Sequence, residues 1–548
     1  MVQLRCKWKG GNGGDAIFLA MLFFSLLATN IVLQLFNGSH GCDFGAHPDE
    51  GAHVVTSLMV RDYMTGGFLD EMNPVTYAKG YYAAFPKVAI GHYPPLFYFL
   101  AGVWLVFGTS VHWFLVFSAL MTSTCGLFTF LIGRQFMGRF PALMATLAFT
   151  LLPLTQQYTS TFMSDMLLLG FSLLAALVLA RFMGSGRLRD SLLFGLVASA
   201  AILTKSSGLL LAFLPCLALL LAGKFHVFKT RAIWMAPVVV SILALPWIAL
   251  TYSITSEGVM MTEGGLYAAK AWSFFSAALV DEAGMPLLVL AAIQLSFGLM
   301  AFVYRHRAFS DIEAVNIAIG FVGFSFYLFV PAGLEQRYLL VLMPSLMLLA
   351  FKSLERLLSG IFGAWRFDKK LERKLFLSAL FACSVVLLVF SSGLRPKYAH
   401  GFRGVIEAVA GEKADKSHGL LVVSDSRGEG ALVAASALAA SLRPEGGVQV
   451  YRGSKRLASS DWLGRNYRPS YETVSGLRQY MSGGDFEFLA VDQGVPPTKR
   501  DDYHDLVRDL IDEHPGDFHS MGSFTTLRKG GNESCIMLYR IGLQQPVR

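Results

Sequence analysis

Long apolar runs recur along the first 391 residues and leave few folds open to this chain. A helix that crosses a bilayer needs about 20 predominantly apolar residues, and residues 16–36 meet that requirement directly. Further apolar segments occupy residues 94–107, 111–132, 139–157, 166–183, 190–204, 207–222, 232–252, 285–304, 312–331, 338–351 and 375–391. Only 15% of the 548 residues are charged, against about 25% in soluble domains. The sequence therefore predicts an α-helical polytopic membrane protein and excludes a soluble enzyme.

Basic residues are distributed unequally among the gaps between these segments. One alternate set of gaps holds 17 lysines and arginines, whereas the other set holds only Lys205, Lys270 and Arg337. Cytoplasmic loops carry the excess of Lys and Arg in membrane proteins. We therefore predict that the basic gaps are cytoplasmic, and that residues 16–36, preceded by a basic tail and followed by no cleavage motif, form an uncleaved first span.

The segment at residues 94–107 fits this charge pattern only if it does not cross the membrane. Its 14 residues would form a helix of about 21 Å, shorter than a hydrocarbon core of about 30 Å. It begins with Pro94 and Pro95, which suit a helix start. We predict a helix at the outer membrane surface here, which leaves about eleven spans, a cytoplasmic N-terminus and an extracytoplasmic C-terminus.

Two large pieces then lie outside the membrane. The first is the loop at residues 37–110, which belongs with the helices in a transmembrane domain at 1–391. The second is the tail at 392–548, where short apolar runs such as GLLVVSD, VQVYRG and FEFLAVDQG indicate strands and alternate with segments of helical spacing such as DDYHDLVRDLIDEH. This pattern predicts an extracytoplasmic C-terminal α/β domain.

Overall charge and cysteine content exclude two further classes of protein. The formal charge of +8 is explained by the basic cytoplasmic loops, so no nucleic-acid partner is predicted. Six cysteines in 548 residues are too few for a disulfide scaffold.

The first outer loop carries the residues most suited to chemistry. His47, Asp49, Glu50 and His53 lie about a dozen residues after the first span. Adjacent carboxylates point in different directions, so at most one of Asp49 and Glu50 need face a given reactant. A carboxylate held there could accept a proton from an attacking hydroxyl, although Asp-Glu is also common in solvated loops.

His92 and Tyr93 stand before the two prolines of the same loop. This stretch is either a structural entry turn or part of a site, in which His92 could contact phosphate or a metal. The spacing of His47, His53, His92 and Asp49 matches no zinc pattern. We therefore predict that no metal or other cofactor is required, and a divalent metal remains the alternative.

Three more outer stretches bring acids and cations close to the membrane surface. Asp165 starts a span, where it either caps the helix or serves a functional role. Lys205 interrupts two apolar runs, and Arg337 precedes Tyr338 at the start of another. Either cation could bind a phosphate, and Arg337 could instead pair with Glu335 or extend to the interface. All these stretches fall on one side of the membrane.

The chain resembles the GT-C fold, polyprenyl-phosphate-sugar-dependent membrane glycosyltransferases, and among them the group of protein O-mannosyltransferases and aminoarabinose transferases. The resembling elements are Pro48-Asp49-Glu50-Gly51-Ala52-His53, Tyr93-Pro94-Pro95-Leu96-Phe97-Tyr98, Phe107-Gly108, Gly133-Arg134, Gly138-Arg139, Pro153, Ser164-Asp165, Leu203-Thr204-Lys205 with Gly208, and Arg337-Tyr338-Leu339 with Pro344. They span residues 16–350. One departure is clear, because the family often has Lys immediately before Pro-Pro, where this chain has Tyr93.

The resemblance implies transfer of a sugar, hexose or pentose, from a polyprenyl phosphate to a hydroxyl, usually with inversion. Asp49 would be the general base, Glu50 would support it or contact the sugar, and Asp165 would line the same cavity. Among the substrate-binding residues, Lys205 and Arg337 are our own choice for the donor phosphate. His53, His92, Tyr93 and Tyr338 complete that set.

The partners expected are a polyprenyl-phosphate-linked sugar, the lipid bilayer and a lipid, glycan or protein acceptor of the cell envelope. We expect the protein in the inner (plasma) membrane of a bacterium. The alternatives are a secondary transporter, for which no internal repeat is found, and a membrane-anchored assembly protein without catalysis. In the latter, replacing Asp49 or Asp165 would have no effect.

Overall fold

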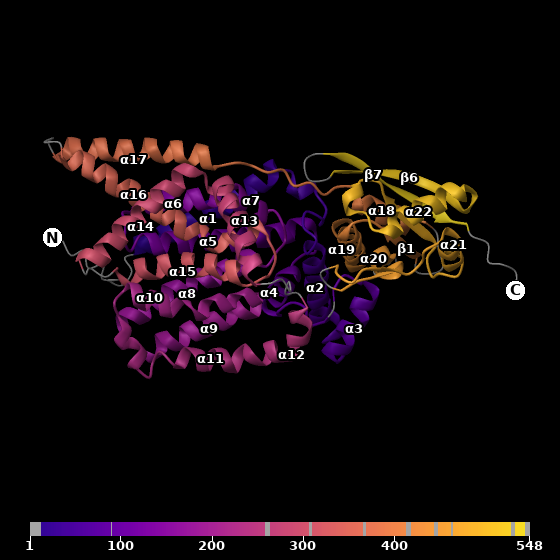
Figure 1. The fold of residues 1–548 in the computed structure, drawn as a ribbon, viewed down its shortest axis with the longest axis horizontal. Helices are drawn as coiled ribbons and strands as arrows, with labels where there is room; N and C mark the ends of the chain where they lie inside the picture. Colours follow the sequence, from indigo (N-terminus) through magenta and orange to yellow (C-terminus); the bar gives the residue numbers. More distant parts are fainter. Residues whose placement is uncertain are drawn as a thin grey trace.

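The computed structural model describes residues 13–88, 90–257, 264–305, 309–364, 369–412, 418–442, 448–461, 464–527 and 532–542. A bundle of helices forms one end of the elongated molecule, and a smaller α/β unit forms the other end (Figure 1). The basic tail before residue 13, used above to orient the first span, lies outside the described residues.

The helical part runs from α1 to α17. Its long helices are α1 (Gly13–Phe36), α5 (Val111–Gly133), α8 (Asp165–Ser185), α9 (Leu188–Thr204), α13 (Gly264–Ala283), α14 (Met285–Arg305), α15 (Asp311–Phe329), α16 (Met343–Ala364) and α17 (Lys369–Ser391). Its shorter helices are α2 (Glu50–Asp62), α3 (Pro74–Ala84), α4 (Leu96–Leu105), α6 (Arg139–Leu151), α7 (Pro153–Thr159), α10 (Leu214–Leu221), α11 (Met235–Leu243) and α12 (Leu245–Ser256).

Six described helices are long and apolar enough to cross a membrane: α1, α5, α8, α14, α15 and α17. The bent pair α11 and α12 adds a seventh if it forms one span. The chain is thus an integral membrane protein, and the total of about eleven spans stays a prediction. Helix α4 has 10 residues, or about 15 Å, too short to cross a bilayer as expected for the 94–107 segment.

Prolines break two segments that the sequence analysis treated as single spans. Leu152 takes an extended ψ of 138° before Pro153 and ends α6, because a residue before proline is disfavoured in the helical region. Pro246 sits in the first turn of α12, and α11 and α12 meet at an angle of 56°. Both breaks follow from the missing N–H and fixed φ of proline.

Helices α8 and α9 form an antiparallel hairpin that fixes the polarity of the bundle. Asp165 opens α8 and Lys205 directly follows α9, and the two side chains are in contact. The turn between the helices, with Arg187 and Arg189, therefore lies at the opposite end of the hairpin. The basic turn and the candidate residues of this hairpin thus lie at opposite ends, and the side of the membrane that each occupies stays a prediction.

The C-terminal part contains a five-stranded mixed sheet in the order β2-β1-β5-β7-β6. Its strands are β1 (His418–Val423), β2 (Val448–Arg452), β5 (Phe488–Asp492), β6 (Phe518–Leu527) and β7 (Glu533–Ile541). Strands β2, β1 and β5 are parallel, and β7 is antiparallel to both β5 and β6. Strands β3 (Ala458–Ser459) and β4 (Arg468–Pro469) form a separate short pair.

The described residues of this part also form the helices α18 (Phe402–Ala410), α19 (Ser426–Leu442), α20 (Gly453–Arg456), α21 (Val474–Ser482) and α22 (Asp502–Glu513). Alternate residues of β1 face opposite sides of the sheet. Leu420 and Val422 belong to the core that contains α18 and α19, whereas Leu421 and Val423 pack in the core of α21 and α22. The predicted α/β fold is confirmed, although β6, α18 and the short elements β3, β4 and α20 were not predicted.

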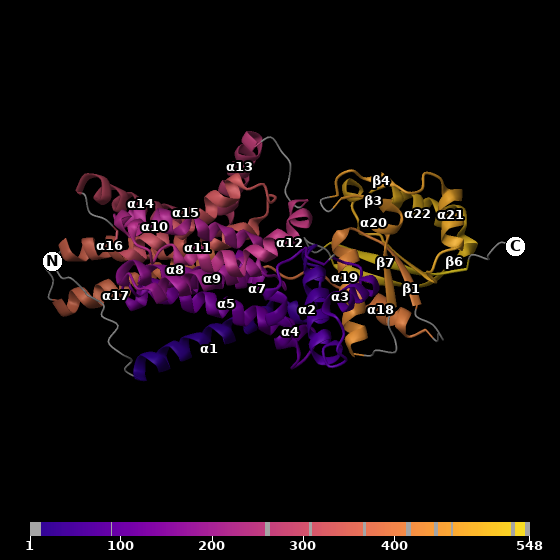
Figure 2. The same cartoon turned by 90° about the horizontal axis from the view of Figure 1, so that it is seen from below.

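Helix α19 joins the two parts by packing directly on α2 (Figures 1 and 2). Gly51 and Gly430 face each other so closely that a Cβ on Gly51 would lie 2.3 Å from the Gly430 carbonyl oxygen. Gly51 therefore depends on glycine for its close approach to the α19 backbone. The start of α2, which carries the predicted carboxylates, is held between the membrane helices and the C-terminal sheet.

Candidate active site

Asp49 immediately precedes α2 and forms an ion pair with Arg337. The Arg337 Nη2 donates to Asp49 Oδ2 at 3.1 Å, and His47 Nδ1 lies 3.7 Å from the same oxygen. Burial by itself would raise the pKa of Asp49, but the charge of Arg337, assisted by His47 and His53, holds it below its usual range. Asp49 is therefore an ionised carboxylate at neutral pH.

Arg337 comes from the 3-10 turn Gln336–Val341 between α15 and α16. Its side chain is buried, and its guanidinium lies 5.5 Å from the centre of the Tyr338 ring. The Nε of Arg337 has no hydrogen-bond partner among the described residues. One guanidinium donor of Arg337 is therefore unused by the described residues while Nη2 binds Asp49.

Asp165 and Lys205 form a second ion pair, with the Lys205 Nζ 2.7 Å from Asp165 Oδ1. Asp165 occupies the first turn of α8, where a negative charge is favoured by the helix dipole. The Lys205 Nζ also lies 5.4 Å from the centre of the Tyr338 ring. Tyr338 therefore contacts both cations. Asp165 can both stabilise the start of α8 and position Lys205, so the two interpretations of this residue are compatible.

His53 packs against the rings of Tyr93 and Tyr98, and His92 is next to Tyr93. The His53 Nδ1 is 2.7 Å from the Tyr98 hydroxyl, and its ring centre is 4.9 Å from that of Tyr93. Burial lowers the pKa of His53 to about 3 and that of His92 to about 4. Both imidazoles are therefore uncharged at neutral pH and offer hydrogen bonds rather than positive charge to a ligand.

Glu50 points away from Asp49, as expected for adjacent carboxylates. It is fully buried, and its Oε1 accepts from Lys397 Nζ at 2.7 Å and from the Phe162 amide at 3.1 Å. Its Oε2 accepts from the Ala46 amide at 2.9 Å. Glu50 thus anchors the loop before α2 to the chain that follows α17. This geometry favours a supporting role over direct contact with a sugar.

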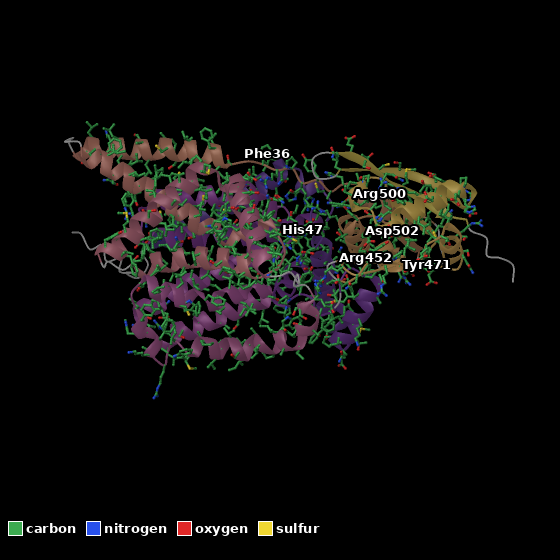
Figure 3. All side chains as sticks on the ribbon, viewed as in Figure 1. Phe36, His47, Arg452, Tyr471, Arg500 and Asp502 are labelled. Carbon is green, nitrogen blue, oxygen red and sulfur yellow. The ribbon has the colours of Figure 1, made fainter. Side chains whose placement is uncertain are left out.

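A cavity of about 1010 Å³ opens where the helical part meets the C-terminal part. His47, from the first outer loop, and Arg452, from the end of β2, lie on either side of this junction (Figure 3). Seven of the nine predicted site residues line the cavity: Asp49, His53, His92, Tyr93, Lys205, Arg337 and Tyr338. Asp165 lies behind Lys205, and Glu50 does not line the cavity.

The C-terminal part supplies cavity residues that the sequence analysis missed. Ser424 and Asp425 follow β1, Ser454 follows β2, and Tyr503 and His504 belong to α22. Ligands bind at the carboxyl ends of parallel strands in open α/β sheets. The ends of the predicted strands β1 and β2 were therefore candidate binding positions, but the sequence did not show that these strand ends face Asp49. Lys87, in the first outer loop, was also missed.

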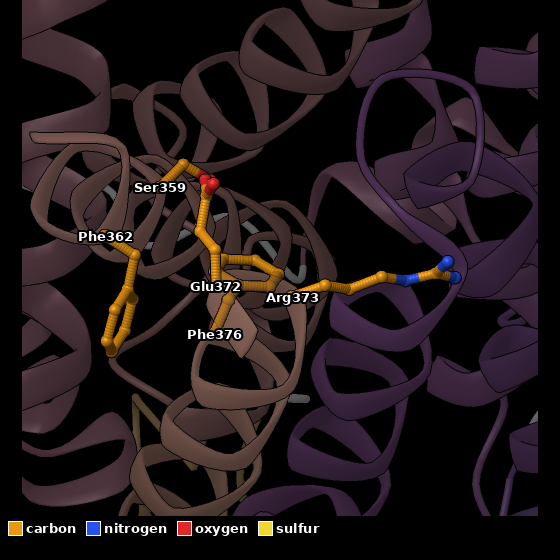
Figure 4. A pocket seen from close by; sticks show the side chains of 5 residues that line it. All are labelled: Ser359, Phe362, Glu372, Arg373 and Phe376. Atoms are coloured by element: carbon orange, nitrogen blue, oxygen red, sulfur yellow. The ribbon is translucent and has the colours of Figure 1, made fainter. Parts of the chain in front are cut away.

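A second, smaller pocket lies between α16 and α17. It is lined by Ser359, Phe362, Glu372, Arg373 and Phe376, and Arg373 points away from the other four side chains (Figure 4). None of the predicted site residues reaches it. Within the described part of the chain, no three His, Cys, Asp or Glu side chains form a group suited to a metal ion.

Comparisons with known proteins agree with this architecture. The family model for dolichyl-phosphate-mannose-protein mannosyltransferases matches residues 92–250. The crystal structure of ArnT from Cupriavidus metallidurans in the apo state matches with a TM-score of 0.58 and 14% identity, covering 97% of this chain and 100% of that chain. ArnT bound to undecaprenyl phosphate gives a TM-score of 0.54 and 13% identity, with 98% and 100% coverage. The chain has the GT-C fold.

A more distant GT-C structure is that of the archaeal oligosaccharyltransferase AglB from Archaeoglobus fulgidus, in complex with an inhibitory peptide and a dolichol-phosphate. It has a TM-score of 0.53 and 11% identity, and the match covers 95% of this chain and 74% of that chain. The curated proteins contain no match. The resemblance drawn from the short motifs is confirmed.

Proposed function

We propose that this GT-C protein transfers a sugar from a polyprenyl-phosphate donor to the hydroxyl of an extracytoplasmic acceptor, with inversion at the anomeric carbon. The observation that carries the proposal is the meeting of two acid–cation pairs, Asp49–Arg337 and Asp165–Lys205, around one cavity at one end of the membrane helices. The undecaprenyl phosphate and dolichol-phosphate bound in the similar structures support this donor class.

The reaction is a single displacement. Asp49 accepts the proton of the acceptor hydroxyl as its oxygen bonds to the anomeric carbon. The bond between that carbon and the phosphate oxygen breaks, and the polyprenyl phosphate leaves with the electron pair. Arg337 and Lys205 stabilise the charge that develops on the leaving phosphate. The Tyr338 ring contacts both cations.

The orientation of the protein follows from the same proposal. The cavity opens on the extracytoplasmic side of a bacterial inner membrane, the N-terminus is cytoplasmic, and a transmembrane domain at 1–391 carries an extracytoplasmic domain at 392–548. The unequal charge of the gaps supports this direction. Labelling of single cysteines introduced into 37–110 and the tail tests it, because labelling from the cytoplasmic side alone would reverse the assignment.

The decisive experiment is a transfer assay with purified protein and a panel of polyprenyl phosphates that carry different radiolabelled hexoses and pentoses. Release of polyprenyl phosphate together with labelled acceptor identifies transfer, whereas movement of intact donor across a vesicle indicates a transporter. Asp49→Asn serves as the catalytic control. If it transfers as fast as the wild type, Asp49 is not the base. Parallel reactions with EDTA test the proposal that no metal is required.

A further inference from the structure

Lys87 is a buried lysine at the junction between the first outer loop and the C-terminal part. It is 8% exposed and lines the large cavity. Its Nζ donates to the Ser426 carbonyl oxygen at 2.9 Å, at the first residue of α19. A Cβ on Gly430 would lie 2.9 Å from the same Nζ. Lys87 is therefore packed against α19 in a defined position.

The charge of Lys87 has no counter-ion in direct contact. No described carboxylate lies within 4.0 Å of its Nζ, and a carbonyl oxygen does not neutralise an ammonium. The neighbouring Glu429 binds Arg452 Nε at 2.8 Å and both the backbone and the hydroxyl of Ser454. Asp425 accepts from the first amides of α19. These acids are already engaged elsewhere.

Lys397 shows the contrast. It is buried to a similar degree, at 6% exposure, but its Nζ contacts Glu50 at 2.7 Å. Buried charges in proteins are normally paired or bound to a ligand. Burial, together with the positive charge of Arg452, lowers the pKa of Lys87 to about 8. An anion in the cavity would restore the charge of Lys87 in full.

An unsatisfied polar side chain lies in the wall formed by the C-terminal part. His504 is 1% exposed and lines the cavity. Its Nδ1 lies 3.0 Å from the Asp501 amide nitrogen and 3.3 Å from the Asp501 carbonyl oxygen, whereas its Nε2 has no partner among the described residues. Buried polar groups of this kind are usually satisfied by a ligand or water.

We propose that Lys87 forms an anion subsite on the C-terminal side of the cavity, and that it binds a phosphate group of a substrate. The proposal rests on the proposed function and adds a phosphate contact that neither Arg337 nor Lys205 provides. Two sources of phosphate fit the same chemistry: the polyprenyl-phosphate donor, and an acceptor that carries its own phosphate. His504 offers a further hydrogen bond to the same ligand.

The test measures binding without any sugar, so it remains informative if sugar transfer is not observed. Thermal unfolding of the detergent-solubilised protein is followed during titration with undecaprenyl phosphate and, separately, with inorganic phosphate against chloride at equal ionic strength. Ligands that bind the folded protein raise its melting temperature. Lys87→Met removes the charge at similar size, and Lys87→Arg keeps it. Lys79→Met removes an exposed charge from the same loop, in α3.

We expect Lys87→Met to weaken phosphate binding by about tenfold to a hundredfold, the usual range for a lost charged hydrogen bond. Lys87→Arg and Lys79→Met should bind like the wild type. A loss with undecaprenyl phosphate assigns the subsite to the donor. A loss with inorganic phosphate alone assigns it to a phosphorylated acceptor. If Lys87→Met keeps the wild-type response to both ligands, or if Lys79→Met loses as much, the proposal is wrong.

Discussion

Asp49 and the donor phosphate should compete for Arg337. In the structure Asp49 Oδ2 occupies one Nη2 donor of this guanidinium at 3.1 Å, in a pair whose side chains are 26% and 9% exposed. A phosphate bound to the same guanidinium would bring a second negative charge to within about 6 Å of Asp49, and two like charges at that distance repel by roughly 1.5–3 kcal/mol at an effective dielectric constant of 20–40. If Asp49 is the base, as proposed above, it therefore opposes donor binding before it serves in the reaction.

Replacing Asp49 with Asn removes this repulsion and keeps the size of the side chain. We expect the variant to bind undecaprenyl phosphate more tightly by about 2 kcal/mol, or roughly thirtyfold. Its sugar transfer should fall by about 10²- to 10⁴-fold, the usual contribution of a general base. Tighter binding combined with slower transfer is a signature that damage to the fold would not produce.

The assay is equilibrium binding of undecaprenyl phosphate in detergent micelles, compared at low and moderate salt. Asp461→Asn is the matched control, because Asp461 lines the same cavity but pairs with Arg465 at 2.8 Å instead of Arg337. Equal or weaker binding by Asp49→Asn would refute the competition. Equal tightening by Asp461→Asn would show that the effect is a general change in cavity charge.

Three further predictions concern stability. The lowered pKa keeps His53 uncharged in the folded protein down to about pH 3, whereas in the unfolded chain this side chain binds a proton below about pH 6.5. The free energy of unfolding therefore falls as the pH is lowered from 6.5 towards about 3. The expected loss of unfolding free energy is about 2 kcal/mol at pH 5. His53→Asn should therefore reduce the fall of the melting temperature between pH 7 and pH 5. If the melting temperature of the variant falls as steeply as that of the wild type, His53 is not the cause of this pH dependence. Glu50→Ala leaves Lys397 buried and unpaired, so we expect a loss of about 3–5 kcal/mol in chemical unfolding; a loss below about 1 kcal/mol would contradict the anchoring role. Gly51→Ala should separate α2 from α19 at Gly430 and expose the junction to limited proteolysis, whereas wild-type resistance would show that the helices can shift without cost.

The sequence analysis grouped residues that the structure brings to one cavity, but it misplaced several helix ends. Asp49, Lys205 and Arg337 are charged residues beside long apolar runs, and the positive-inside rule placed them on one face without any knowledge of tertiary contacts. The helix ends depended on prolines inside apolar runs, such as Pro153 and Pro246, whose effect was not included. Hydropathy shows that a segment is buried in lipid or protein, but not whether it stays straight.

The wall contributed by the C-terminal part could not be predicted because it depends on how two units dock. Ser424 and Ser454 follow strands that were predicted, yet nothing in their local pattern indicates that they face the membrane site. The contact between Gly51 and Gly430 that sets this docking joins residues almost 400 positions apart. A single glycine such as Gly430, in a helix rich in small residues, gives no sequence signal for such a contact.

The two ion pairs of the cavity explain how the proposed base, Asp49, stays paired with Arg337 until a donor phosphate binds. Asp49 and Asp165 neutralise Arg337 and Lys205 while the cavity is empty, which avoids buried unpaired charges. A phosphate that takes over Arg337 would remove the strongest influence that keeps the pKa of Asp49 low. Asp49 would then become a stronger base only when donor is present. Arg337→Lys keeps the positive charge but loses the guanidinium, which can bind Asp49 and a phosphate at the same time. On this reasoning the substitution should impair sugar transfer more than it impairs donor binding.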